Sequence, residues 1–100
     1  IVFHDDLDIN LGKVTVKFGG SSAGHNGIES IDKFIGKDYS RVRIGIGSPE
    51  SKDMVADHVL DNFLDDEKSS ITKLTENIVE YLPELIDKKL NLFSSKVNQS

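Results

Sequence analysis

The sequence has 100 residues, of which 37% are hydrophobic, so it is long enough for one small domain with a packed core. It contains no cysteine, which excludes disulfides and thiolate metal sites. It also has no apolar run that would cross a bilayer or act as a signal peptide. We therefore expect a cytoplasmic protein without a membrane anchor.

Charge is unevenly distributed along the chain. The formal net charge is -5; residues 1–43 hold six basic and six acidic side chains, whereas residues 44–100 hold six basic and eleven acidic ones. Acidic surfaces repel nucleic acid, so any contact with RNA is expected in the first of these two parts.

The first part predicts two strands and a helix. Ile1 to His4 is apolar and begins as a strand already under way, which suggests that the chain starts inside a larger domain. Residues 13–18 alternate between polar and apolar side chains, the period of a half-buried strand. A run of small residues at 19–27 follows, and Gly36 is a plausible end for the helix after it. That helix has apolar residues at helical spacing: Ile28, Ile31, Phe34 and Ile35.

The second part predicts a further strand and more helices. Residues 41–47 alternate again, 48–52 form a turn-rich connection, and 54–59 suggest a short amphipathic helix. Asp65 can cap a long helix, which should kink at Pro83 or restart with that proline in its first turn. Its apolar stripe consists of Ile71, Leu74, Ile78, Leu82, Leu85 and Ile86. The polar tail from Ser94 is expected to fray, and the whole chain reads as one α/β piece.

Asp5 is the first candidate for chemistry. A carboxylate at the carboxyl end of a strand can point into a site at the open edge of an α/β sheet. The alternative is a turn or capping aspartate in an acidic loop, which the sequence alone favours about two to one. Asp6 and Asp8 are expected to be solvated loop or capping residues.

The glycine-rich loop at 19–27 is the second candidate. It can bring backbone amides close to a substrate, and it carries His25 and Asn26 at its far end. It has neither the G-x-G-x-x-G fingerprint nor the ending of a P-loop. Alternatively the loop is only a linker, with Asn26 as a helix N-cap and His25 packed beside it. The three histidines lack metal-ligand spacing, so no metal site is expected.

Lys17 and Arg43 form the third candidate. Each lies on the polar side of a predicted strand, and two cations on neighbouring strands can hold a phosphate. Solvated charge on a sheet face is the more common outcome for such residues, so the two cations alone are a weak signal.

Three strings together carry a specific resemblance: F-H-D-D-L-D at 3–8, G-G-S-S-A-G-H-N-G at 19–27 and R-V-R-I-G-I-G-S-P at 41–49. In this order and at these separations they resemble bacterial peptidyl-tRNA hydrolase, and the likeness covers essentially all of the chain. The resemblance implies a monomeric, metal-independent and cofactor-free enzyme in the cytoplasm, which releases peptides from peptidyl-tRNA and so recycles tRNA during translation. Its fold would be a single three-layer α/β domain with a twisted mixed sheet flanked by helices.

The resemblance also assigns site residues. Asp5 matches the aspartate that hydrogen-bonds the general-base histidine, and Asn26 matches an asparagine that contacts tRNA. Lys17 and Arg43 match the cations that clamp the terminal phosphate of tRNA. Gly24, with neighbours such as His25, would form a gate beside the peptide channel, and residues 48–66 would form a mobile lid.

One part of the family pattern is not in these 100 residues. The base histidine, and the asparagines that act with it, lie in an N-terminal segment of the family, and neither His4 nor His25 should be promoted to replace that histidine. Residues 1–100 are therefore expected to be the C-terminal portion of one domain and to be inactive alone. The alternative is a non-catalytic RNA-binding module of the same fold.

Overall fold

The computed structural model describes residues 1–47 and 65–99. Its centre is a three-stranded sheet with the strand order β1-β3-β2, formed by β1 (Val2–Asp6), β2 (Val14–Phe18) and β3 (Ser40–Gly45). The middle strand β3 runs parallel to β1 and antiparallel to β2. The predicted α/β class and mixed sheet are confirmed, and the three strands lie within two residues of their predicted bounds.

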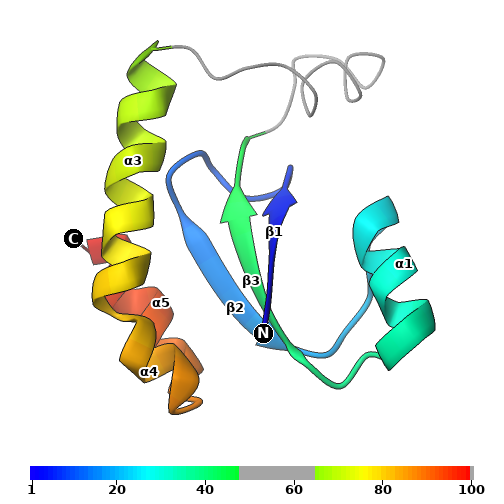
Figure 1. The fold of residues 1–100 in the computed structure, drawn as a ribbon. Helices are drawn as coiled ribbons and strands as arrows, with labels where there is room; N and C mark the ends of the chain where they lie inside the picture. The colour runs from blue at the N-terminus through cyan, green and yellow to red at the C-terminus, as the bar shows by residue number, and fades with distance from the viewer. Residues whose placement is uncertain (48–64, 100) are drawn as a thin grey trace.

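Helices lie on both sides of this sheet. Helix α1 (Asn26–Ile35) lies on one side, and α3 (Asp65–Glu80), α4 (Leu82–Ile86) and α5 (Leu90–Gln99) lie on the other (Figure 1). The described part of the chain thus has the three layers that the resemblance implies.

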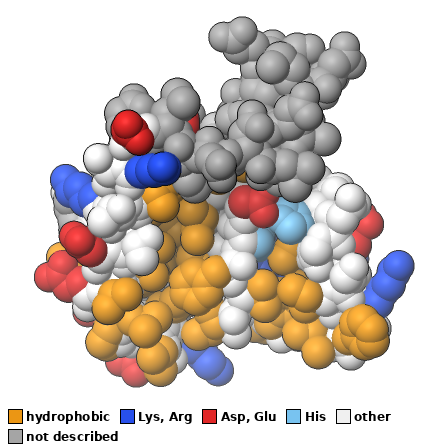
Figure 2. Space-filling model, turned by 45° about the horizontal axis from the view of Figure 1, so that its top comes forward, with side chains coloured by type: hydrophobic (Ala, Val, Ile, Leu, Met, Phe, Trp, Pro, Cys, Tyr) orange, Lys and Arg blue, Asp and Glu red, His pale blue; other side chains and the backbone are white. Residues whose placement is uncertain are grey.

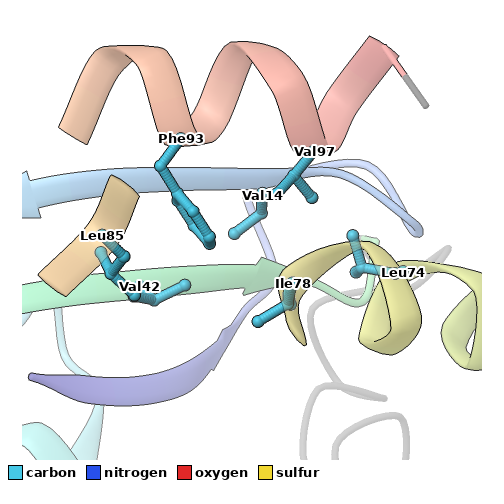
Figure 3. Close-up of a cluster of buried hydrophobic side chains, with 7 residues drawn as sticks. All are labelled: Val14, Val42, Leu74, Ile78, Leu85, Phe93 and Val97. Carbon is cyan, nitrogen blue, oxygen red and sulfur yellow. The ribbon is translucent and has the colours of Figure 1, made fainter. Parts of the chain in front are cut away.

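The hydrophobic core lies between the sheet and the second group of helices (Figure 3). Strand alternation turns Val14 and Val42 toward these helices, because successive side chains of a strand point to opposite faces. The remaining buried members of this core come from the helices: Leu74, Ile78, Leu85, Phe93 and Val97. Burying side chains of this size contributes about 1.5–3 kcal/mol each.

The C-terminal region differs from its prediction in two places. Asp65 is the first residue of α3 rather than a residue before it. The tail from Ser94 is helical rather than frayed, because α5 buries Phe93 and Val97 against the sheet.

The chain restarts as a new helix at Leu82, with Pro83 in the first turn, which is one of the two outcomes predicted for this proline.

A close contact at the end of β3 explains the first glycine of the R-I-G-I-G string. The loop between β1 and β2 crosses β3 at Gly45, whose N–H donates to the Lys13 carbonyl at 2.9 Å. A Cβ at Gly45 would overlap the carbonyl oxygens of Ile9 and Asn10. Only glycine allows the loop to lie this close, and the loop in turn fixes the ends of β1 and β3.

Helix α1 is only partly covered. Ile28 is buried and Ile31 is half-buried, but Phe34 is 88% exposed and Ile35 is 63% exposed. The predicted apolar stripe is present, and among the described residues its N-terminal half, with Ile28 and Ile31, is better covered than its C-terminal half.

Several predictions fall outside the described residues. These are the turn at 48–52, the short helix at 54–59 and the lid at 48–66 apart from its last two positions. Within the described ranges, no helix is long and apolar enough to cross a membrane.

Candidate functional site

Asp5 and His25 meet at the carboxyl end of β1. The Nε2 atom of His25 lies 2.8 Å from Asp5 Oδ1, and the two side chains are 26% and 38% exposed. Histidine side chains lie next to an acidic one on the face shown in Figure 2, with apolar side chains gathered below them. The sequence selected both residues but did not predict that they bond to each other.

His25 also caps helix α1. Its Nδ1 accepts a hydrogen bond of 3.1 Å from the Ile28 amide, which is the role of an N-cap side chain. Asn26 is therefore the first helical residue and not the N-cap, and His25 does more than pack beside it. Because Nδ1 must be unprotonated to accept, the proton of the neutral ring lies on Nε2 and is donated to Asp5.

This arrangement leaves His25 poorly suited to act as a base. One ring nitrogen accepts from a backbone amide, and the other donates to a carboxylate. Neither nitrogen can take a proton from water while both hydrogen bonds persist, which agrees with the expectation that His25 does not replace the base histidine.

His4 supports the same corner of the site. Its Nδ1 lies 2.8 Å from the Asp5 carbonyl oxygen, which can only accept, so Nδ1 carries the proton. Its ring packs edge-on against the ring of His25, with ring centroids 5.1 Å apart. The His4 ring therefore limits the positions that the His25 ring can take.

Asp6 pairs with Arg43 on the sheet face that carries α1. Arg43 Nε donates to Asp6 Oδ2 at 2.8 Å, and the Asp8 amide donates to Asp6 Oδ1 at 2.8 Å. Burial alone raises the pKa of Asp6, but these two hydrogen bonds and the charges of Arg43 and His4 outweigh it, so the pKa lies below its ordinary value of 3.8. Asp6 was predicted to be a solvated loop or capping residue; instead it is the last residue of β1 and holds a cation in place.

Lys17 lies on the same sheet face, nearer the other end of the sheet. It is opposite Arg41 in the register, whereas Arg43 is opposite Thr15. Asp5 lies opposite Ile44 of β3 and Lys17 lies opposite Arg41, three residues earlier in the same strand. This offset corresponds to about 10 Å along the strands. The two predicted phosphate ligands are thus on adjacent strands, as expected, with Arg43 between Lys17 and Asp5 along the sheet.

The glycine-rich loop joins these two ends of the sheet. It starts beside the first residues of β3, where the Gly19 amide donates to the Tyr39 carbonyl at 2.9 Å, and it ends at His25, beside Asp5. Gly24 adopts a φ of +82°, and a Cβ at this position would meet no atom within 4 Å, so its backbone conformation and not crowding requires glycine. Asn26 is exposed at the start of α1.

A buried polar cluster under this loop was not selected from the sequence. It consists of Arg41, Asp32 and Tyr39, which come from β3, from α1 and from the residue before β3. The available signal was Arg41 itself, which shares a strand face with Arg43 two residues away. Among the described residues no three histidine, cysteine or acidic side chains gather as a metal site would require.

Comparison with known proteins identifies the family to which this fold belongs. A family model described as peptidyl-tRNA hydrolase matches residues 1–100. Over 98 residues the chain is 69% identical to the peptidyl-tRNA hydrolase of Pelagibacter ubique, covering 98% of this chain and 53% of that protein. It is 52% identical over 97 residues to that of Campylobacter jejuni subsp. doylei, covering 96% and 52%.

Solved structures agree with the sequence matches. The crystal structure of peptidyl-tRNA hydrolase from Acinetobacter baumannii superposes with a TM-score of 0.83 at 34% identity, over 96% of this chain and 49% of that one. The fold is therefore that of an α/β class of enzymes. The chain is a member of the peptidyl-tRNA hydrolase family, and it spans about half the length of the relatives it matches.

Proposed function

We propose that the complete protein hydrolyses the ester bond between peptide and tRNA in peptidyl-tRNA, with Asp5 supporting a base histidine from outside these 100 residues. The observation that carries this proposal is the hydrogen bonding and exposure of the Asp5 carboxylate. Its Oδ1 is held by His25, and the side chain remains 38% exposed. A carboxylate oriented in this way can accept a second N–H through Oδ2.

The proposed reaction uses Asp5 through that histidine. The carboxylate accepts the N–H on one side of the imidazole, which leaves the other ring nitrogen unprotonated and directed at water. That nitrogen takes a proton as the water oxygen bonds to the ester carbonyl carbon. The carbon–oxygen bond to the tRNA ribose then breaks, the ribose oxygen receives the proton, and the peptide leaves with a free carboxyl group. Asp5 stabilises the imidazolium formed in between.

The tRNA would lie across the face that carries the cations. Arg43 is oriented by Asp6, and Lys17 is exposed, so both suit the clamp for the terminal phosphate. Asn26 follows His25 directly and can donate to or accept from the substrate, and the backbone of Gly24 would form part of the gate. Clamping the phosphate away from Asp5 leaves the ester free to reach the carboxyl end of β1.

We expect the complete protein to work as a monomer in the cytoplasm, where it recycles tRNA from prematurely dissociated peptidyl-tRNA. The acidic balance of residues 44–100 supports tRNA contact on the face of α1 rather than on that of α3 to α5.

The test is cleavage of an N-blocked aminoacyl-tRNA by the complete protein and by residues 1–100 alone. We expect hydrolysis by the complete protein and none by the short chain, whose folding is checked by circular dichroism. Turnover by the short chain, lost on His4→Gln, would identify His4 as the base and refute the proposed role of the upstream segment. Binding of tRNA without cleavage by the complete protein would support the RNA-binding alternative instead.

A further inference from the structure

Between its two ends, the loop that carries the candidate site is bonded to a buried side chain of the sheet. Between Gly19 and His25 the loop crosses from the start of β3 to the carboxyl end of β1. Along this path the carbonyl oxygen of Ser21 accepts a hydrogen bond of 3.2 Å from Arg41 Nη1. Arg41 projects from β3 beneath the loop and is only 3% exposed.

The same guanidinium also holds helix α1. Arg41 Nη2 lies 3.1 Å from Asp32 Oδ1, and the Asp32 side chain is 10% exposed. The hydroxyl of Tyr39 donates to that carboxylate oxygen at 2.7 Å, and the Arg41 guanidinium stacks over the Tyr39 ring, 4.7 Å from its centroid. Burial and the bond to Asp32 raise the pKa of Tyr39, which keeps its hydroxyl protonated as a donor.

We propose that Arg41 is a positioning residue for the proposed hydrolysis, because it fixes both segments that flank His25 and Asn26. Ser21 precedes this pair by four residues and Asp32 follows it by six, so one planar group sets the distance between the loop and the helix. A shift of either segment would move the His25 ring, which orients Asp5, and the Asn26 side-chain amide, which is expected to contact tRNA. This proposal rests on the proposed function.

The chemistry of the cluster requires arginine in particular. Two donors in a fixed plane point in different directions, one at a neutral carbonyl and one at a carboxylate, and the compact ammonium of lysine cannot reproduce this fork. The geometry also has a cost: among the described residues the buried Arg41 Nε has no hydrogen-bond partner. The position of the guanidinium thus allows hydrogen bonds to Ser21 and Asp32 but leaves its Nε donor without one.

The test compares Arg41→Lys with Tyr39→Phe in the complete protein. Tyr39→Phe removes one bond to Asp32 but keeps both contacts of Arg41, so it serves as a control for destabilisation of the cluster. The first readout is amide hydrogen exchange of Ala23 and His25, whose N–H groups donate to Ser21 Oγ and to the Ser22 carbonyl. The second readout is kcat and KM for an N-blocked aminoacyl-tRNA.

We expect Arg41→Lys to speed exchange of these loop amides about tenfold and to lower kcat/KM by a similar factor, with little change for Tyr39→Phe. Equal effects of the two variants, or unchanged loop exchange in Arg41→Lys, would overturn the proposal. If Arg41→Lys does not fold, Asp32→Asn replaces it, because a neutral amide holds the guanidinium less firmly than a carboxylate. Asp32→Asn should also speed exchange of the loop amides. Unchanged exchange in Asp32→Asn would overturn the proposal. If the wild-type protein cleaves no ester, the proposed function fails, while loop exchange still decides whether Arg41 fastens the loop.

Discussion

The ring of His25 connects the start of helix α1 to the Asp5 carboxylate, donating from Nε2 across 2.8 Å while its Nδ1 caps the helix. The cap determines which nitrogen holds the proton, and that nitrogen donates to Asp5 Oδ1. Helix capping and orientation of the proposed active-site carboxylate thus depend on a single side chain.

Replacement of His25 should separate these two roles. In the complete protein, His25→Ala removes the cap and should lower the free energy of unfolding by about 1 kcal/mol, whereas His25→Asn, with a good capping side chain, should retain most of it. Both variants lose the contact to Asp5 and should lose activity to a similar extent. Urea unfolding and ester cleavage measure the two effects, and activity that follows stability across both variants would contradict this division.

Lys17 should contribute to tRNA affinity as a phosphate ligand. Lys17→Ala is expected to weaken binding several-fold and to lower the slope of log affinity against log salt by about one. Lys73→Ala is the matched control, because Lys73 is an exposed lysine of α3, on the other side of the sheet. Equal losses for the two variants would mean that only total charge matters.

The pairing of Asp6 with Arg43 should make stability depend on acid pH. Because the folded-state pKa of Asp6 lies below its ordinary value of 3.8, the pair stabilises the fold fully above that value and less as pH falls through the folded pKa. Asp6→Asn should therefore cost up to about 1 kcal/mol at neutral pH, and the difference from wild type should shrink below pH 3.8. Urea unfolding of both proteins across this pH range measures the difference in unfolding free energy. A difference that does not change with pH would argue against the Asp6–Arg43 pair.

Asn98 should stabilise the outer edge of the sheet. Its side-chain amide donates to the Val14 carbonyl at 2.8 Å and accepts from the Val14 amide at 2.9 Å, as a neighbouring strand would. Asn98→Ala should cost about 1–3 kcal/mol, since it leaves two partly buried backbone groups of β2 unpaired. Asn91→Ala, at an exposed position of the same helix, is the control, and similar unfolding free energies for the two variants would contradict the role of Asn98.

The strands and the first helix could be predicted because their signals are local. Alternation identifies β2 and β3, and Gly36 ends α1, where its amide bonds to the Asp32 carbonyl. The tail from Ser94 could not be read in this way. Its helix is stabilised by burial of Phe93 and Val97 and by the contact of Asn98 with β2, all of which depend on tertiary packing.

The site was predictable as a set of residues but not as a set of contacts. The spacing of the three strings identified Asp5, His25 and Arg43, yet nothing local indicates that His25 bonds to Asp5 or that Asp6 takes Arg43. The role of Arg41 is not predictable from the sequence, because an arginine on the polar side of a strand usually faces solvent. Here α1 and the loop bury it.

The central claim is that Asp5 acts in the chemical step. The most direct measurement is the single-turnover rate of ester cleavage by the complete protein carrying Asp5→Asn, with tRNA affinity measured in parallel. We expect the rate to fall by about a hundredfold or more while affinity changes less than about threefold, because an amide cannot stabilise the imidazolium. An unchanged rate would contradict the claim and make Asp5 a structural residue at the end of β1.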